Sequence, residues 1–181
     1  MQKTISLYQR NYDGDKLVRD EVVPGAEWVL NGDGVATRKW DGTCCMVRGG
    51  QLFKRLQWKE QRGPAPDTWE HWSGDAAQRS GHGWMPVGVG PEDHLHRMAD
   101  LTGLPDGTYE LCGPKIQHNP EHLDFYVLKR HGDEILYNAP RTFSALREWF
   151  IGKDIEGIVW HHPDGRMVKI KGRDFGIHRG G

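Results

Sequence analysis

The sequence predicts an α+β domain in which short antiparallel strands outnumber the helices. Glycine and proline are frequent, with 24 and 10 residues in a chain of 181, as is typical of many turns between short elements. Several short stretches alternate apolar and polar side chains, the pattern of a half-buried strand. Helical periodicity is confined to residues 91–104 and 142–150. The length suits one domain with a sizeable core, so we expect residues 1–181 to form a single domain.

Signals for three strands lie in the first half of the chain. Residues 35–47 alternate loosely around Asp41-Gly42, which predicts a hairpin of two strands joined by a turn. A third strand is expected at residues 52–56, after the turn residues Gly49-Gly50. Residues 60–91 are rich in glycine, proline, tryptophan and aspartate without a stable period, so we expect long surface loops with a few short elements there.

Two helices are expected in the second half. Residues 91–104 begin with a proline, which suits a first helical turn, and carry apolar side chains at helical spacing. Residues 142–150 place apolar side chains on one face and are followed by Gly152, a residue typical of a helix end. The apolar residues of the two helices are Leu95, Met98, Leu101 and Leu104, and Phe143, Leu146 and Phe150.

Four further strands complete the expected fold. Residues 108–112 and 124–130 are rich in the apolar and aromatic residues that favour strands. Residues 157–161 and 167–171 are expected to pair, because Pro163-Asp164-Gly165 between them is a strong hairpin signal.

Composition restricts the class of protein. No window approaches the length of apolar residues that a membrane span needs, so a membrane partner is not expected. The N-terminus has no apolar run of signal-peptide length, so we expect a cytoplasmic location. The net charge is −1, from 24 basic and 25 acidic residues. A surface that binds phosphates must therefore come from local clustering of cations.

The cysteines and histidines show no metal-binding spacing. Cys44, Cys45 and Cys112 form no CxxC pair, and the adjacent two continue a predicted strand, which favours packing roles over nucleophiles. The ten histidines include the pairs 94/96 and 161/162. Because no cysteines stand at zinc spacing from these pairs, we expect solvated or structural histidines.

Four short segments, taken in order, point to one kind of chemistry. Alternate side chains of a strand share a face, so Lys169 and Lys171 are expected on one face of the last strand, opposite its apolar residues. By the same count, Glu156 is expected to share a face with Ile158. This arrangement suits a cleft lined by lysines and carboxylates. The four segments are Lys39-Trp40-Asp41-Gly42, Glu110-Leu111-Cys112-Gly113, Glu156-Gly157-Ile158-Val159 and Lys169-Ile170-Lys171.

The order of these segments resembles the ligase and mRNA-capping superfamily of covalent nucleotidyltransferases. The resemblance covers residues 37–172, and residues 38–45 with 109–115 look most like the small single-domain ATP-dependent RNA ligases that act 5′ to 3′. It implies a nucleotidyltransferase domain in which antiparallel sheets form a nucleotide cleft flanked by helices. An OB-fold is not expected, because the sequence leaves no room for one after Lys171.

The resemblance also implies a role for each charged residue of the motifs. Lys39 would attack the α-phosphate of ATP and hold AMP as a phosphoramidate. Lys169 and Lys171 would lower the pKa of that amine, bind the α-phosphate and stabilise the transition state. Glu156 would hold Mg²⁺, for which Mn²⁺ can substitute, and Asp41 would steady the turn or the metal.

Further residues are expected to bind the nucleotide. Glu110 would bond the ribose hydroxyls, and Arg55 would contact a phosphate or the ribose. An aromatic side chain would stack on the base, and Phe125 is favoured over Tyr126 for this role. Without an OB-fold motif, other cations would have to orient the pyrophosphate. The candidates are Lys59, Arg62, Arg173 and Arg179.

The reaction that the resemblance implies is ATP-dependent RNA ligation, a step of RNA repair. Lys39 takes AMP from ATP and transfers it to a 5′-phosphate RNA end, and a 3′-hydroxyl then displaces AMP to seal the strand. The alternatives are a DNA-nick ligase, a GMP-transferring capping enzyme and a catalytically inactive domain that binds nucleotide or RNA. Transfer of AMP to proteins or small molecules is a weaker alternative. The sequence identifies no protein partner.

Overall fold

The structure is a computed structural model that describes residues 1–180. It divides into two compact units. The central unit consists of Met1 and residues 41–131, and the terminal unit consists of residues 2–40 and 132–181. The chain passes between the units three times, after Met1, Trp40 and His131, and the expectation of a single domain stays a prediction.

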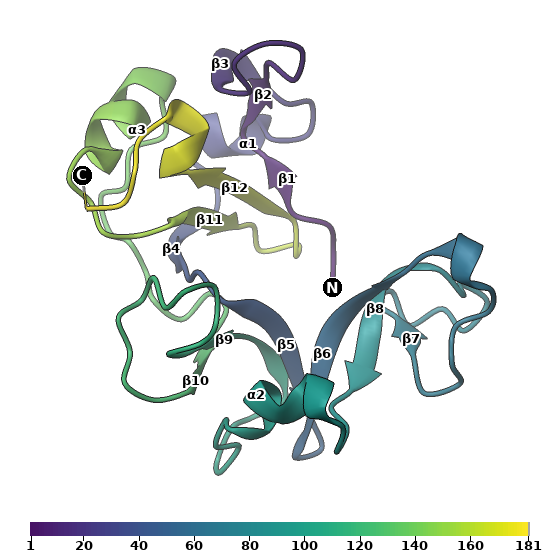
Figure 1. Cartoon of the computed structure of the whole chain (residues 1–181). Coiled ribbons are helices and arrows are strands. Elements are labelled where there is room, and N and C mark those ends of the chain that lie inside the picture. The colour runs from purple at the N-terminus through teal and green to yellow at the C-terminus, as the bar shows by residue number, and fades with distance from the viewer. Residues whose placement is uncertain (181) are drawn as a thin grey trace. The chain divides into compact units, whose positions relative to one another are not determined.

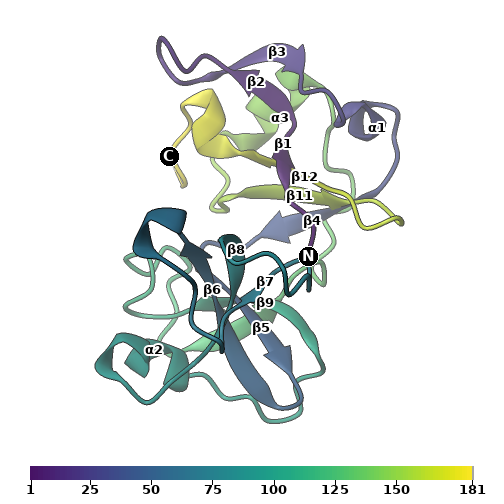
Figure 2. The same ribbon diagram turned by 90° about the vertical axis from the view of Figure 1, so that its right-hand side faces the viewer.

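The terminal unit is built on a four-stranded sheet with the strand order β1–β12–β11–β4 (Figure 1). β1 runs parallel to β12, and the other neighbours are antiparallel. Figure 2 shows the four strands of this sheet from another side. These strands are Ile5–Ser6 (β1), Met167–Lys171 (β12), Gly157–His161 (β11) and Val35–Lys39 (β4). A separate antiparallel pair consists of β2 (Tyr8–Arg10) and β3 (Val18–Val22).

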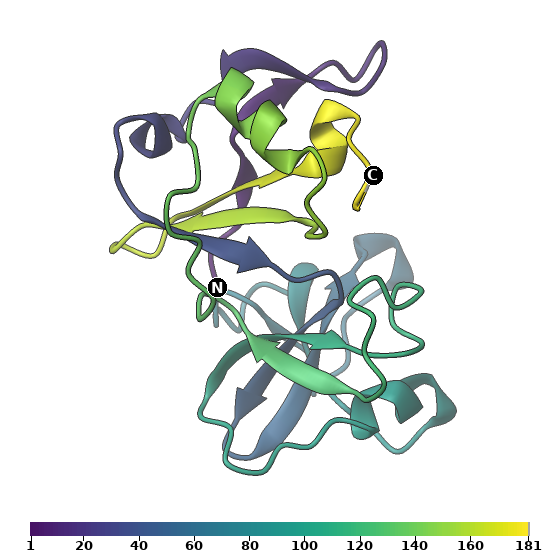
Figure 3. The same ribbon diagram turned by 90° about the vertical axis from the view of Figure 1, so that its left-hand side faces the viewer.

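Helical segments cover one face of the four-stranded sheet. Figure 3 shows α3 (Phe143–Phe150) and the short helix η3 (Gly172–Phe175) on this face, and α1 (Glu27–Leu30) adds side chains to the same core. The face is apolar because alternate residues of β11 and β12 turn towards it. These inward residues are Ile158, Trp160, Val168 and Ile170, each 0% exposed. On the opposite face, β12 carries Lys169 and Lys171.

The central unit contains a six-stranded sheet with the order β10–β9–β5–β6–β8–β7, and all its neighbours are antiparallel. The strands are Val127–Arg130 (β10), Gly107–Cys112 (β9), Thr43–Arg48 (β5), Gln51–Trp58 (β6), Gly81–Pro86 (β8) and Glu70–His71 (β7). Its helical segments are one turn long. They are η1 (Glu60–Arg62), η2 (Pro91–Asp93) and α2 (His94–Arg97).

The two faces of the six-stranded sheet carry different side chains. One face holds the larger apolar cluster, against which Leu95 of α2 packs. Its buried members are Cys45, Val47, Leu52, Tyr109, Leu111, Ile116 and Leu128. The opposite face holds a smaller cluster of Cys44, Phe53 and Trp84. Glu110 pairs with Cys44 across β5 and β9 and therefore lies on this second face.

The α+β prediction with antiparallel sheets and few helices is confirmed. The pair expected at residues 157–161 and 167–171 forms β11 and β12 with the same bounds. The helix expected at 142–150 forms as α3, with Leu146 and Phe150 buried. The nucleotidyltransferase fold and the lack of an OB-fold stay predictions. Among the described residues, no helix has the length and apolar character needed to cross a bilayer.

The hairpin expected around Asp41-Gly42 is wrong. Both strands form, but β4 pairs with β11 of the terminal unit, whereas β5 pairs with β6 and β9. The segment between them passes close to β9, because a Cβ at Gly42 would lie 2.1 Å from the carbonyl oxygen of Leu111. Gly42 therefore allows a close approach to a different strand and not a tight reversal.

Residues 60–91 are more ordered than the surface loops that we expected. β8 pairs with β6 over six residues, and Trp69 and Trp84 are 1% and 2% exposed. The sequence of β8 does not alternate apolar and polar residues, partly because the strand needs a glycine at position 83. A Cβ there would lie 2.3 Å from the indole of Trp69. A glycine required for aromatic packing thus resembles a loop residue in the sequence.

The helix expected over residues 91–104 is also wrong in length. Only η2 and α2 form there, and Met98 is 58% exposed. Asp93 is buried and accepts hydrogen bonds from Lys54 and from the backbone N–H of Gly88, so the chain folds around this carboxylate. The strand expected at 124–130 begins three residues late, at Val127.

Candidate functional site

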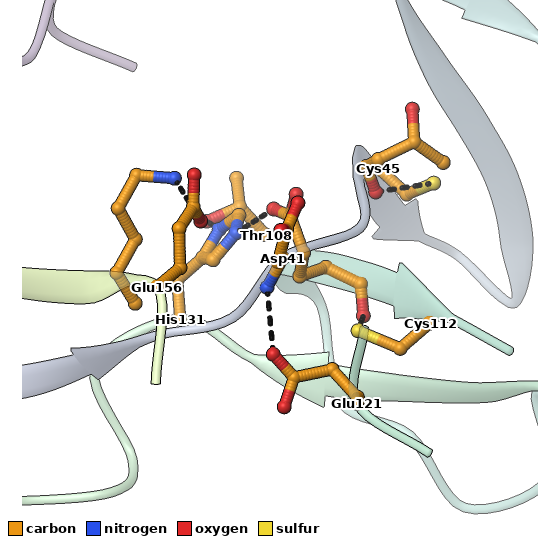
Figure 4. Close-up of polar contacts among 10 residues, drawn as sticks. Asp41, Cys45, Thr108, Cys112, Glu121, His131 and Glu156 are labelled. Atoms are coloured by element: carbon orange, nitrogen blue, oxygen red, sulfur yellow. Dashed lines mark hydrogen bonds and ion pairs between the residues drawn. The ribbon is translucent and has the colours of Figure 1, made fainter. Parts of the chain in front are cut away.

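A carboxylate of the terminal unit contacts two lysines from different strands. The Nζ of Lys39 donates a hydrogen bond to Oε2 of Glu156 at 2.7 Å, and the Nζ of Lys171 lies 3.5 Å from Oε1. The side chains of Lys39, Glu156 and Lys171 are 22%, 11% and 15% exposed. Figure 4 draws the Glu156 contact. The carboxylate therefore bridges β4 and β12 in a setting largely shielded from water.

The register of the four-stranded sheet explains this geometry. Gly157 of β11 pairs with Lys39 on one side and with Lys171 on the other. A Cβ at Gly157 would lie 2.2 Å from the carbonyl oxygen of Ile170, so a larger residue would push β12 away. The glycine of the EGIV segment thus keeps β11 and β12 close, with a lysine on each side of it.

Lys169 lies two residues before Lys171 on the same face of β12, where it pairs with Val159 of β11. Burial lowers the pKa of Lys169, and the charges of Lys171 and Lys39 lower it further. Burial also lowers the pKa of Lys171, although Glu156 acts in the opposite direction. Three ammonium groups thus share a face with one carboxylate, and this excess of positive charge suits a bound phosphate.

Asp174 holds the C-terminal end of β12 in place and was missed in the sequence. Its side chain is 3% exposed, pairs with the guanidinium of Arg10 and accepts a hydrogen bond from the backbone N–H of Lys171 at 2.8 Å. The short helix η3 begins at this point. Asp174 therefore fixes the backbone from which Lys171 projects, and no local sequence pattern distinguishes it from a surface aspartate.

The prediction that Glu156 shares a face with Ile158 is wrong. Ile158 is 0% exposed in the core, whereas the carboxylate of Glu156 contacts lysines on the opposite face. β11 begins at Gly157, so Glu156 precedes the regular strand and is not bound by its alternation. The departure from the pattern is what places this carboxylate among the lysines.

In the central unit, Glu110 and Arg55 lie on the same face of the six-stranded sheet. Glu110 pairs with Cys44, and Arg55 follows Lys54, which pairs with Cys45. Alternation therefore places Arg55 on the face of Cys44 and Glu110, where it is exposed. Lys54 lies on the other face and forms an ion pair with Asp93.

His131 is a partner of Glu110 that the sequence did not reveal. Its Nε2 lies 2.7 Å from Oε2 of Glu110, and its Nδ1 lies 3.0 Å from Oγ1 of Thr108. Figure 4 shows His131 beside Thr108. β10 positions the histidine, because its last pair, Arg130 with Tyr109, leads directly into it. The spacing along the sequence gives no signal for this contact.

Asp41 and Phe125 also lie in the central unit. The backbone N–H of Asp41 donates a hydrogen bond to the carboxylate of Glu121 at 3.2 Å (Figure 4). Phe125 is 63% exposed just before β10, whereas Tyr126 packs against the larger apolar cluster. An exposed ring is available for stacking and a packed ring is not, so Phe125 remains the favoured candidate.

The side chains of this cluster include donors of the kinds that Mg²⁺ and the phosphates of ATP need. Proteins usually hold Mg²⁺ through one or two carboxylates, waters and substrate phosphates, and Glu156 supplies such a carboxylate. Lys39, Lys169 and Lys171 suit the phosphates. Of the cations considered for the pyrophosphate, Arg62 stacks on Trp58, and the guanidinium of Arg179 bonds Asp154.

Comparisons with known proteins bear on the family. The RNA ligase 1 family model matches residues 90–179. RNA ligase 1 of Rattus norvegicus is 26% identical over an alignment of 219 positions, which spans 79% of this chain and 67% of that protein. RNA ligase 1 of Mus musculus gives the same values. RNA ligase 1 of Danio rerio is 34% identical over 87 residues, which cover 42% of this chain and 26% of that protein.

The matched span includes several residues that the motifs singled out. These are Glu110, Phe125, Glu156, Lys169 and Lys171. The roles of these residues, and those of Lys39, Asp41 and Arg55, stay predictions. The family match and the curated relatives together support the assignment of this chain to the RNA ligase family.

Proposed function

We propose that this chain is an ATP-dependent RNA ligase that carries AMP on Lys39. The observation that supports this most directly is the contact of one carboxylate, Glu156, with both Lys39 and Lys171. Withdrawing such charges from water costs free energy that their attraction often fails to recover. A cluster with excess positive charge is therefore better explained by a bound phosphate than by stability.

In the first step the Nζ of Lys39, as a free amine, attacks the α-phosphorus of ATP. A P–N bond forms while the bond between the α-phosphorus and the pyrophosphate oxygen breaks. The ammonium must first lose a proton, and Oε2 of Glu156 lies 2.7 Å away as an acceptor. The ammonium groups of Lys169 and Lys171 stabilise the charge that develops on the phosphate oxygens.

Mg²⁺ held near Glu156 would neutralise phosphate charge and orient the leaving group. Mn²⁺ is expected to substitute, because it also prefers oxygen ligands. Glu156 would hold the ion largely through water, since both carboxylate oxygens already contact lysines. Asp41 is the second carboxylate that we propose for the metal or for steadying the turn beside Lys39.

The second and third steps use the ends of an RNA strand. An oxygen of a 5′-phosphate attacks the phosphorus of lysyl-AMP, so a pyrophosphate link forms and the P–N bond breaks. A 3′-hydroxyl then attacks the former 5′-phosphate, so a phosphodiester forms and AMP leaves. The name shared by the relatives, RNA ligase 1, favours RNA over DNA as the substrate.

The central unit would supply recognition of the nucleoside. We propose that Glu110 bonds the ribose hydroxyls and that Arg55, on the same sheet face, contacts the ribose or a phosphate. Phe125 would stack on the base, an interaction worth about 1–3 kcal/mol.

The test is covalent labelling of the purified protein. We would incubate it with α-labelled ATP and Mg²⁺, then measure the adduct by denaturing electrophoresis and intact mass. The wild type should gain one AMP, and Lys39→Ala should gain none. Lys153→Ala is the matched control, since Lys153 is an exposed lysine of the same unit. Full sealing activity in Lys39→Ala would overturn the mechanism.

Other outcomes of the same assay separate the alternatives. An adduct with GTP but not with ATP would indicate capping chemistry. Sealing of nicked DNA in preference to RNA would indicate a DNA ligase. No adduct with either nucleotide, from folded protein, would indicate a domain that binds nucleotide or RNA without turnover.

A further inference from the structure

We propose that Cys44, Glu110 and His131 form a binding site for a zinc-class divalent metal ion. Each residue offers one ligand atom, and these atoms all lie within 4.8 Å of one another. The cluster lies in the central unit, on the sheet face opposite the larger apolar cluster. It supplies sulfur, oxygen and nitrogen donors, a combination that zinc binds readily.

Three neighbouring strands of one sheet fix the ligand positions. Cys44 of β5 pairs directly with Glu110 of β9. β10 pairs with β9 on its other side, and His131 follows the last residue of β10. Ligands carried by paired strands keep their separations better than ligands on loops. Two of the three ligands therefore stand on paired strands, and the third follows directly after such a strand.

The separations suit the size of a zinc site. With Zn–S of about 2.3 Å and Zn–N or Zn–O of about 2.0–2.2 Å, tetrahedral ligand atoms lie about 3.4–3.6 Å apart. The observed ligand atoms all lie within 4.8 Å of one another, so the widest pair would have to close by no more than about 1.2 Å, a distance that side-chain rotation can supply. The shortest pair, Nε2 of His131 and Oε2 of Glu110 at 2.7 Å, would exchange one hydrogen bond for two metal bonds.

Thr108 orients the histidine for this purpose. Its Oγ1 lies 3.0 Å from Nδ1 of His131, so Nδ1 can donate to the hydroxyl while Nε2 keeps its lone pair for a metal. Histidines that bind metals usually have such a partner at the second nitrogen. Metal binding would require the thiolate form of Cys44 and a free lone pair on Nε2 of His131.

Occupancy of the site would have a consequence for the enzyme. Glu110 is the residue that the proposed function assigns to the ribose, so an ion on its carboxylate and a ribose hydroxyl would compete. Zinc should therefore inhibit AMP transfer at low ATP, and ATP should relieve the inhibition. This consequence rests on the proposed function, whereas the metal site itself does not.

The test uses Co²⁺ as a spectroscopic substitute for zinc, with the full reduced chain and no ATP. Tetrahedral Co²⁺ bound to a thiolate gives visible d–d bands and a thiolate-to-cobalt band in the near ultraviolet. We expect both at one equivalent of Co²⁺, and we expect Zn²⁺ to abolish them. No bands with folded wild-type protein would overturn the proposal.

Matched variants identify the ligands. Cys44→Ser should remove the thiolate band, and His131→Ala should weaken Co²⁺ binding by more than tenfold. Thr108→Val keeps the shape but loses the hydroxyl, and should weaken binding by about 10–100-fold. Cys112→Ser, at a buried cysteine outside the cluster, and His118→Ala, at an exposed histidine, should change neither. If folded Cys44→Ser keeps the wild-type Co²⁺ spectrum, or if Cys112→Ser loses it, the metal binds at a different site.

Separate assays distinguish this proposal from the proposed function. Co²⁺ spectra of Lys39→Ala should equal those of the wild type, because Lys39 is not a ligand. AMP transfer in Mg²⁺ alone tests the ligase mechanism without zinc. Bound Co²⁺ with zinc-insensitive AMP transfer would leave the metal site standing and would overturn the competition at Glu110.

Discussion

The Nζ of Lys39 lies 2.7 Å from Oε2 of Glu156, although 117 residues separate the two in the sequence. The contact is made possible by β11, which lies between the strands that carry Lys39 and Lys171. The amine of Lys39 thus lies beside the carboxylate of Glu156 in a cluster that also holds the ammonium groups of Lys169 and Lys171.

Glu156→Gln should therefore change catalysis more than folding. The amide keeps the shape but loses the charge that accepts the proton of Lys39 and attracts Mg²⁺. We expect the rate of lysyl-AMP formation to fall by on the order of 10²–10³-fold, the usual effect of removing one electrostatic group from an active site. Rapid-quench labelling with α-labelled ATP would measure this rate. Glu148→Gln, on the exposed side of α3, should match the wild type, and an equally fast Glu156→Gln would remove Glu156 from the mechanism.

Gly157→Ala should damage both stability and activity. The added Cβ would lie 2.2 Å from the carbonyl oxygen of Ile170, so β11 and β12 must separate. We expect a loss of about 1–3 kcal/mol in the free energy of unfolding, measured by urea denaturation, together with a weaker AMP adduct. Gly88→Ala is the control, because its Cβ would lie 3.4 Å from the nearest atom. Equal stability of the two variants would show that β12 accommodates the methyl group.

The sequence predicts the last strand pair well because its pattern is local. Residues 157–161 and 167–171 alternate cleanly around a strong turn, and both strands form with the expected bounds. The same alternation places Lys169 and Lys171 on one face, as the structure confirms by burying Val168 and Ile170 on the other.

Long-range contacts explain what the sequence could not predict. The chain between β4 and β5 departs from a hairpin because Gly42 approaches Leu111, about 70 residues away on β9. The contact between His131 and Glu110 depends on the pairing of β10 with β9 and carries no spacing signature. Where we expected a helix at 91–104, Asp93 is buried and forms an ion pair with Lys54 of β6, a contact between distant residues that helical periodicity does not encode.

Lys169→Met should be more stable than the wild type at neutral pH. The pKa of Lys169 is lowered on folding, below the unfolded value of about 10.4, so the charged form carries an energetic penalty in the folded state. Between the folded and unfolded pKa values the unfolded chain binds more protons, so the wild-type stability rises with pH there. Below the folded pKa the penalty is present in full.

We therefore expect Lys169→Met to gain about 1 kcal/mol at neutral pH and to lose this advantage as the pH approaches ~10. Thermal unfolding would show a shift of roughly 2–4 °C for a chain of this size. Lys153→Met, at an exposed lysine, should show no such pH dependence. The stabilised variant should nevertheless form less lysyl-AMP, and a variant both less stable and equally active would contradict the electrostatic account.

Glu110→Ala should reduce the preference for ATP over 2′-deoxy-ATP. If the carboxylate of Glu110 bonds the ribose hydroxyls, the 2′-hydroxyl of ATP makes a charge-assisted hydrogen bond in the wild type. Such a bond is worth about 1.5–3 kcal/mol, which corresponds to roughly tenfold or more in nucleotide affinity. Removing the carboxylate should weaken the binding of ATP more than the binding of 2′-deoxy-ATP. The KM values of the two nucleotides for lysyl-AMP formation should therefore converge. Glu70→Ala is the control, because Glu70 is an exposed carboxylate of the same sheet that pairs with Arg48. If folded Glu110→Ala keeps the wild-type ratio of the two KM values and both KM values, another residue binds the ribose. If both KM values rise by the same factor, Glu110 instead positions a neighbour such as His131.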